Sequence, residues 1–348
     1  MRKFIWAPLF VFALVLSACG GAATTSTAPA ATATTEATTA TEATTEATTS
    51  TEAMTTTEAT TSTAATSSVA ACASVPANVS GKLNIAGSSA LLPLFQLAAT
   101  NYQTANKDVQ IAVTAGGSGS GRSQVCQGKV EIGNSDVPLG QKDATDLKCD
   151  DALQTPVAIQ AFAPVANKQG PGSVTSLSKE QLQGIFTCQI TNWKDVGGDD
   201  QAIVVVNRAK GSGTRSNMAK YLYDGDDTKF CTGASEEDNS ETVKQTVGQT
   251  PGAISYLGFA YLSDPSLVAL SIDNVAATPA DIQNGSWPIA SPGYSITKGA
   301  WNDVETGLLC YVLSPEFQNS PQFAQLGFVP VIDAQGQLTH PQIQGPVQ

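Results

Sequence analysis

The apolar positions of the chain form short runs that alternate with glycine–serine turns and with segments of helical spacing. Four runs have the length and composition of buried strands, and they lie at residues 83–86, 109–113, 130–133 and 202–206. Segments of helical character follow three of them, at residues 93–102, about 122–128 and 212–222. Pro93 suits the first turn of such a helix. The pattern therefore predicts a repeated strand–turn–helix unit.

Alternating strands and helices are typical of an α/β fold with largely parallel sheets. In such folds, ligands bind beyond the carboxyl ends of the strands. The globular part has about 265 residues, which is enough for two domains. Residues 155–167 are apolar and lack helical caps, so we expect a strand that crosses between the domains. Residues 287–291 would be the return crossing, and residues 328–331 would pack back on the first domain.

The N-terminus has the pattern of a secretory signal. Arg2 and Lys3 precede an apolar run at residues 4–16. The following Leu16-Ser17-Ala18-Cys19 resembles the lipobox of bacterial lipoproteins, in which the cysteine is lipidated. An ordinary secretory signal with a chance cysteine is the alternative, whereas the run is short for a transmembrane helix. We expect a signal peptide at residues 1–18 and lipidation of Cys19.

Residues 20 to about 70 consist almost entirely of Ala, Thr, Ser and Glu. This composition offers no apolar face that could offset the entropy of the chain, so it predicts disorder. We therefore expect residues 19–78 to be a stalk that begins at the lipidated Cys19. The protein would then be extracytoplasmic and attached to the cell membrane by its lipid.

Charge and cysteine usage exclude several classes of partner. Without the signal and stalk, 25 acidic and 16 basic residues leave a formal charge of −9, which argues against a nucleic-acid partner. Beyond Cys19 there are six cysteines, an even number that favours disulfides outside the cytoplasm. No C-x-x-C occurs, and the single histidine, His340, lies in a polar tail, so no metal site is expected.

The order of the cysteines favours one pairing among the 15 that are formally open. It joins neighbours along the chain, as Cys126–Cys149 and Cys188–Cys231, and leaves Cys72 with Cys310.

The stretch from Asn207 to Leu222 carries the strongest candidate chemistry. A strand ends there and a helix begins near Ser212, with two glycines at the joint. Unpaired amides at a helix start favour an anion, and Ser212, Thr214 and Arg208 add donors. The stretch lacks the glycine spacing and Lys-Ser/Thr pair of a P-loop. A capped helix without a ligand is the alternative, although residues 87–93 and 114–121 form similar loops.

Asp136 follows the run at residues 130–133 and has two interpretations. It could be an aspartate of a turn or a helix N-cap. Alternatively, it could be a buried acceptor for the ligand.

These loops together resemble the phosphate-binding proteins of bacterial ABC phosphate transporters. The similarity covers about residues 79–333 and rests on the order and spacing of segments 87–94, 117–121, 133–139, 208–214, 252–256, 287–289 and 326–330. It implies a two-lobed α/β fold of the periplasmic-binding-protein type II, with the ligand cleft between the lobes. Domain I would comprise residues 79–160 plus 290–340, and domain II residues 161–289.

The resemblance also implies a set of phosphate-binding residues. Carried over by position, they are Ser88, Ser89, Ala90, Leu91, Leu92, Ser118, Asp136, Arg208, Ser212, Gly213 and Thr214. Two positions depart from relatives, because many of these have threonine in the loop at Ala90-Leu91 and several have an aspartate in place of Lys210. We therefore expect the first-loop contact to rest on backbone amides and on Ser88 or Ser89, and Arg208 to be supported by other groups.

The resemblance implies a substrate-binding subunit that delivers inorganic phosphate to the membrane permease of an ABC transporter. We expect a monomer without cofactor, metal or catalytic residues. A binding protein for sulfate or molybdate is one alternative, but it would have no use for Asp136, whose carboxylate needs a proton on the ligand. A phosphatase-like enzyme is the alternative of another class. No histidine or lysine is placed in the sequence to activate Ser118 or Ser212.

Overall fold

The computed structural model describes residue 72, residues 75–333 and residues 335 and 339. The predicted signal peptide, Cys19, most of the predicted stalk and His340 lie outside the described residues. The strands are β1 (Gly81–Gly87), β2 (Val109–Ala115), β3 (Ile132–Ser135), β4 (Ala152–Asn167), β5 (Ser176–Leu177), β6 (Val204–Arg208), β7 (Ser235–Glu237), β8 (Ala253–Gly258), β9 (Leu267–Ala269), β10 (Ser271–Ile272) and β11 (Ala290–Lys298). The α-helices are α2 (Leu92–Ala105), α3 (Ser118–Cys126), α4 (Gln141–Asp146), α5 (Lys179–Phe186), α6 (Gly213–Tyr223), α7 (Ser240–Gln249), α8 (Pro279–Gln283), α9 (Asp303–Val312), α10 (Pro315–Gln318) and α11 (Pro321–Gln325). Short 3₁₀ helices are η1 (Trp193–Val196), η2 (Asp227–Lys229) and η3 (Phe259–Tyr261).

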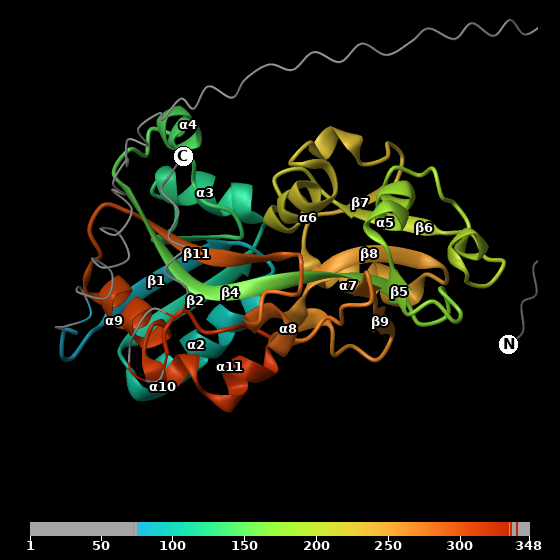
Figure 1. Cartoon of the computed structure of the whole chain (residues 1–348). Coiled ribbons are helices and arrows are strands. Elements are labelled where there is room, and N and C mark those ends of the chain that lie inside the picture. Colours follow the sequence, from blue (N-terminus) through green and yellow to red (C-terminus); the bar gives the residue numbers. More distant parts are fainter. Residues whose placement is uncertain (1–71, 73–74, 334, 336–338, 340–348) are drawn as a thin grey trace, which may run out of the picture. The chain divides into compact units, whose positions relative to one another are not determined.

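The main sheet has nine strands in the order β2-β1-β3-β11-β4-β8-β6-β7, with β9 paired to β4 (Figure 1). We call the part built on β2, β1, β3 and β11 the first lobe, and the part built on β8, β6 and β7 the second lobe. Pairing is parallel between β1, β2 and β3 and again between β6, β7 and β8. The strands β4 and β11 pair antiparallel to their neighbours, so the sheet is mixed rather than largely parallel.

Strand β4 belongs to both lobes, as the apolar run at residues 155–167 predicts. Residues 152–161 pair with β11, and Phe162 to Ala166 pair with β8. The Phe162 amide donates to the Ile289 carbonyl at 3.0 Å, and Trp287 Nε1 donates to the Phe162 carbonyl at 3.1 Å. Two exchanged backbone hydrogen bonds of 2.9 Å then join Ile159 to Val329. The chain thus returns to the first lobe alongside β4.

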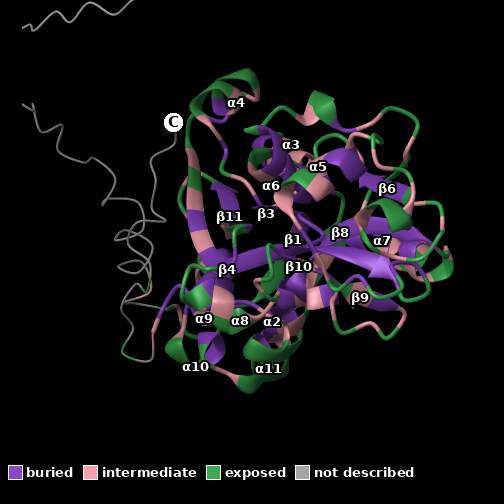
Figure 2. Ribbon diagram, turned by 45° about the vertical axis from the view of Figure 1, so that its right-hand side comes forward, coloured by how far each residue is buried: buried purple, intermediate pink, exposed green. Residues whose placement is uncertain are grey.

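Helices cover both faces of the first-lobe strands. Figure 1 shows α2 and α9 on one side of β1 and β4 and α3 on the other. One apolar core joins Leu83 and Ile85 of β1 to Phe95 of α2 and Leu308 of α9. A second apolar core, which contains Trp193, lies mainly in the other lobe. In Figure 2, β8 and most of β4 are coloured as buried, in line with continuous burial from Val157 to Asn167.

Helix α3 begins at Ser118, four residues before the predicted start near Arg122. Its first turn contains Gly119 and Gly121, which have low helix propensity and indicate a loop when read alone. Packing overrides that propensity. A Cβ atom on Gly121 would lie 2.7 Å from Gly87 Cα and 2.7 Å from the Asn134 carbonyl oxygen. The glycines therefore allow the start of α3 to lie directly against the backbones of β1 and β3.

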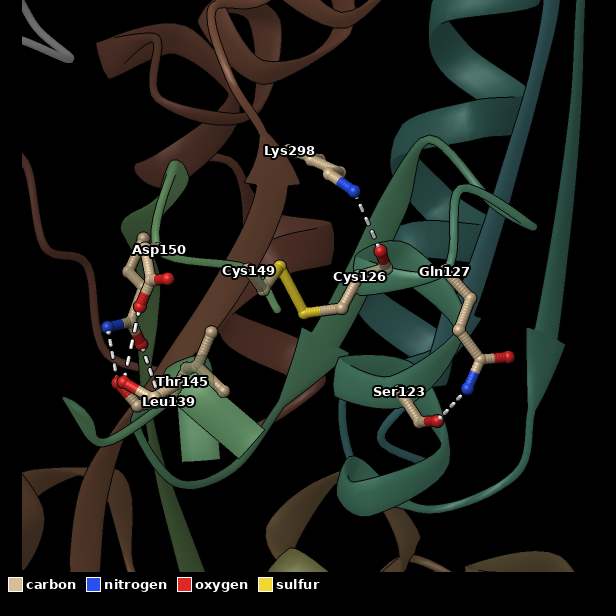
Figure 3. Close-up of a disulfide and its surroundings, with 9 residues drawn as sticks. Ser123, Cys126, Gln127, Leu139, Thr145, Cys149, Asp150 and Lys298 are labelled. Atoms are coloured by element: carbon tan, nitrogen blue, oxygen red, sulfur yellow. Dashed lines mark hydrogen bonds between the residues drawn. A yellow bond between two sulfur atoms is a disulfide. The ribbon is translucent and has the colours of Figure 1, made fainter. Parts of the chain in front are cut away.

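Three disulfides join Cys72 to Cys310, Cys126 to Cys149 and Cys188 to Cys231, so the predicted pairing is confirmed. Figure 3 shows Cys126 at the end of α3, bonded to Cys149 and accepting a 3.0 Å hydrogen bond at its carbonyl from Lys298 Nζ. This cross-link ties α3 to the segment that leads into β4.

The residue boundaries of the two predicted domains stay a prediction. Among the described residues, no helix combines the length and apolar character that a membrane crossing requires.

Candidate functional site

The loops that follow β1, β3 and β6 meet where the two lobes touch. A Cβ atom on Gly213, at the start of α6, would lie 2.2 Å from Ser118 Oγ and 2.6 Å from Asp136 Cβ. The Gly119 amide donates to the Gly211 carbonyl at 2.9 Å, which joins the start of α3 to the β6–α6 loop. Residues from both lobes therefore pack into one buried polar centre.

Asp136 lies in this centre and is 2% exposed. No other carboxylate side chain among the described residues is buried as deeply. Its Oδ1 accepts from the Ser88 hydroxyl and, at 3.1 Å, from Gln160 Nε2. Its Oδ2 accepts from Thr214 Oγ1 at 3.1 Å. The next helix, α4, begins at Gln141 with Gly140 as its N-cap, so the N-cap interpretation of Asp136 is wrong. The carboxylate instead faces donors from both lobes.

The pKa of the Asp136 carboxyl reflects opposing effects. Burial, the largest effect, raises the pKa because it disfavours the charged form. Hydrogen bonds from Ser88, Gln160 and Thr214 and the charge of Arg208 act in the opposite direction, and the net result is a raised pKa. The protonation state of the Asp136 carboxyl therefore depends on the charges and hydrogen-bond donors beside it.

Arg208 ends β6 and is 1% exposed. Its guanidinium donates to the carbonyls of Glu237 and Asp238, at 3.3 and 3.2 Å. It also donates to Ser240 Oγ at 3.3 Å and to Ser89 Oγ at 3.2 Å. Within the described part of the chain, it forms no ion pair with a carboxylate. Neutral groups thus hold this buried guanidinium in place. This agrees with the expectation that, without an aspartate at position 210, other groups support Arg208.

Lys210 does not take part in that support. It is exposed, and it lines a recess of about 520 Å³ together with Gly116, Ser120 and Asp238.

The two serines of the first loop have different partners. Ser88 Oγ accepts from the amides of Ala90 and Leu91, both at 3.1 Å, while its hydroxyl donates to Asp136. Ser89 Oγ lies 2.9 Å from Ser240 Oγ and accepts from the Ser240 amide at 3.0 Å. Ser88 therefore belongs to the Asp136 cluster, whereas Ser89 joins the first lobe to the start of α7 and to Arg208.

The remaining predicted residues lie at helix starts. Ser118 begins α3, and its Oγ accepts from the Asp136 amide at 2.9 Å. Ser212 is the N-cap of α6, with its Oγ accepting from the Arg215 amide at 3.2 Å. Gly213 and Thr214 form the first turn of α6, and Leu92 begins α2. Because first-turn amides lack partners within their helix, α2, α3 and α6 all bring donors to this region.

The residues of this centre that sequence reasoning missed include Gln160 and Ser240. A signal existed for Gln160, since it is a polar residue inside the apolar run of β4. For Ser240, the preceding Asn239 is a good N-cap and indicates a helix start. Neither signal reveals the contacts themselves, which join positions 24 and 151 residues apart.

Among the described residues, no group of three or more His, Cys, Asp or Glu side chains could hold a metal ion.

A two-lobed α/β protein with helix starts gathered around a buried polar centre has the architecture of a periplasmic-type binding protein. A family model described as a PBP superfamily domain matches residues 72–316. The phosphate-binding protein PstS of Bacillus subtilis (strain 168) is 42% identical over 247 residues, which cover 71% of this chain and 80% of that protein. The chain belongs to the PstS family of phosphate-binding proteins within the PBP superfamily.

Solved structures agree with this assignment. A putative phosphate ABC transporter substrate-binding protein from Clostridium perfringens, with bound phosphate, has a TM-score of 0.66 and 28% identity, covering 72% of this chain and all of that one. An ABC-type phosphate transport receptor from Vibrio cholerae has a TM-score of 0.56 and 24% identity, covering 71% and 99% of the two chains, and supports the fold alone.

Proposed function

We propose that this protein binds inorganic phosphate between its lobes and delivers it to the permease of an ABC transporter. The observation that carries the proposal is the meeting of the Asp136 carboxylate with Arg208 and the first turn of α6 in one buried centre. The PstS relatives and the Clostridium perfringens protein with bound phosphate support the choice of ligand.

The donors of the centre suit a dehydrated anion. A buried anion is tolerated only when nearly all its oxygens accept hydrogen bonds, and charged donors contribute most. We propose that Arg208, Ser118, Thr214 and the α6 amides of Gly213 and Thr214 supply these bonds. Ser88, Ser89, Ser212 and the amides of Ala90, Leu91 and Leu92 complete the set. Because Ser88 Oγ accepts from the amides of Ala90 and Leu91, this hydroxyl must turn away from them before they can donate to a ligand, and it can then donate to the ligand itself.

Asp136 sets the choice among tetrahedral anions. A carboxylate beside an anion is strongly unfavourable unless a proton lies between them. Hydrogen phosphate carries that proton at neutral pH, whereas sulfate does not. We therefore propose phosphate as the ligand, rather than sulfate or molybdate.

We further propose that the protein acts as a binding protein without catalytic activity, as a monomer outside the cytoplasm, attached to the membrane through a lipid on Cys19. The hydroxyls of Ser118 and Ser212 support the first point, because Ser118 Oγ accepts from the Asp136 amide and Ser212 Oγ accepts from the Arg215 amide. Neither contact joins the hydroxyl to a histidine or lysine that could take its proton.

Calorimetric titration of the protein with phosphate, sulfate, molybdate and a phosphate monoester tests the proposal. We expect tight binding of inorganic phosphate alone and no release of phosphate from the ester. Equal binding of sulfate would contradict the role of Asp136, and turnover of the ester would favour the enzyme alternative.

A further inference from the structure

Gln160 is a buried polar residue in the middle of the crossing strand β4. Its neighbours Ile159 and Ala161 are apolar and buried, and Gln160 itself is 2% exposed. Its Nε2 donates to Asp136 Oδ1 at 3.1 Å. The amide nitrogen of Gln160 therefore donates to the carboxylate on which the proposed choice of anion depends.

The other half of the amide has no partner. Gln160 Oε1 is buried and accepts no hydrogen bond from any described residue. An unpaired buried acceptor is destabilising, so its presence beside a binding centre requires an explanation. The opposite strand leaves the space that the amide needs. A Cβ atom on Gly293 would lie 3.2 Å from Gln160 Nε2 and 2.6 Å from Leu91 Cδ2.

The groups that face the Asp136 carboxyl come from several elements. They are Ser88 of the β1–α2 turn, Gln160 of β4, Thr214 of α6, the charge of Arg208 from β6 and, more distantly, Tyr261 of η3. Three of these groups donate hydrogen bonds to the carboxylate. Gln160 combines such a donor with a buried acceptor atom that has no partner among the described residues.

We propose that Gln160 binds the ligand's proton: Nε2 fixes Asp136 Oδ1, and Oε1 accepts a hydrogen bond from a protonated oxygen of the bound phosphate. This inference rests on the proposed function. With Asp136 and Gln160 both available as acceptors, the site takes dihydrogen phosphate as well as hydrogen phosphate. An amide oxygen accepts from an O–H group and gains nothing from sulfate, so Gln160 also adds to the discrimination.

The test compares phosphate affinity at about pH 5 and about pH 8, a range over which phosphate gains its second proton. Gln160→Met removes both amide atoms from a side chain of similar length. Gln154→Met is the matched control, because Gln154 lies on the same strand and its amide exchanges hydrogen bonds of 2.6 and 2.9 Å with the Leu139 backbone. Thermal unfolding without phosphate checks that each variant is folded.

We expect Gln160→Met to lose about tenfold more affinity, relative to wild type, at the lower pH than at the higher. The reason is that the second proton of the ligand, which phosphate carries mainly at the lower pH, loses its acceptor in this variant. The Gln154→Met control should keep the wild-type ratio of the two affinities. An unchanged ratio in Gln160→Met would overturn the inference.

A second variant covers the case in which the methionine protein does not fold. Gln160→Glu keeps the shape but places a second carboxyl beside Asp136. Protonated at low pH, it resembles glutamine, whereas ionised at high pH it repels both Asp136 and the ligand. Phosphate affinity should therefore fall by about tenfold or more, relative to wild type, from about pH 5 to about pH 8. A wild-type pH profile in this variant would also overturn the inference, whereas a wild-type protein that binds no phosphate at either pH would refute the proposed function itself.

Discussion

Arg208 is a buried guanidinium whose described hydrogen bonds all go to neutral groups. Two carbonyls and two hydroxyls orient it, so its charge has no carboxylate ion-pair partner among the described residues, as the proposed role in anion binding requires. A carboxylate partner would compete with the anion for that charge. The position of Lys210, exposed at the edge of a recess, is consistent with this arrangement.

Replacing Arg208 by alanine should weaken phosphate binding by about 2–5 kcal/mol, because one member of a buried charged pair is lost. Arg208→Lys should restore only part of the loss, since lysine lacks the planar fork of donors. Calorimetric titration measures both. Arg122→Ala, which removes an arginine of α3 that pairs with Asp143, is the control and should leave affinity unchanged. Wild-type affinity in Arg208→Ala would show that this side chain does not bind the ligand.

At the residue scale, the sequence predicts loop residues better than their partners. Asp136, Arg208 and Ser118 were identifiable because each lies where a strand ends or a helix begins. The roles of Gln160 and Ser240 were not, because they depend on contacts between elements far apart in the chain. The different partners of Ser88 and Ser89 likewise follow from the direction of each side chain in the folded turn.

The start of helix α6 packs directly against residues of the first lobe. Gly213 lies so near Ser118 and Asp136 that any side chain there displaces the start of the helix. The element itself was predictable from the glycines and hydroxyl residues at Ser212. The early start of α3 was not, because its glycines are favourable only once they pack against β1 and β3.

Gly213→Ala should therefore lower phosphate affinity by at least about tenfold, because the added Cβ would lie 2.2 Å from Ser118 Oγ and the lobes cannot close. Gly248→Ala on α7 is the matched control. It is also a glycine within a helix, and its Cβ would meet only the Ser266 side chain. Calorimetric titration of both variants with phosphate tests this. Equal phosphate affinities in Gly213→Ala and Gly248→Ala would show that the close packing at Gly213 is not needed for binding.

At the scale of the whole molecule, the crossing strand β4 makes the two lobes one sheet. Its long apolar run was visible in the sequence because a strand buried on both faces needs no alternation. The mixed direction of the sheet was not visible, since strand direction depends on the path of the connections. The three disulfides follow the order of the cysteines, which sequence reasoning predicts only as the simplest pairing.

The proposed lipid on Cys19 would attach the whole molecule to the membrane. Cys19→Ala should release the protein from membranes into the aqueous phase of a detergent partition, because the lipid would be its attachment. Wild-type protein should enter the detergent phase. A Cys19→Ala variant that remains with the detergent would contradict the lipid anchor and leave another segment to account for attachment.

Asp136 is proposed to select phosphate through the proton that phosphate carries, and the Asp136→Asn variant tests this selection. Asparagine keeps the shape, removes the negative charge and can donate an N–H bond to the anion. Wild type and variant should be titrated with phosphate and with sulfate at neutral pH. We predict that the variant keeps measurable phosphate binding and gains sulfate affinity by at least about an order of magnitude, since the repulsion between carboxylate and sulfate is gone. Unchanged sulfate affinity in Asp136→Asn would contradict the account.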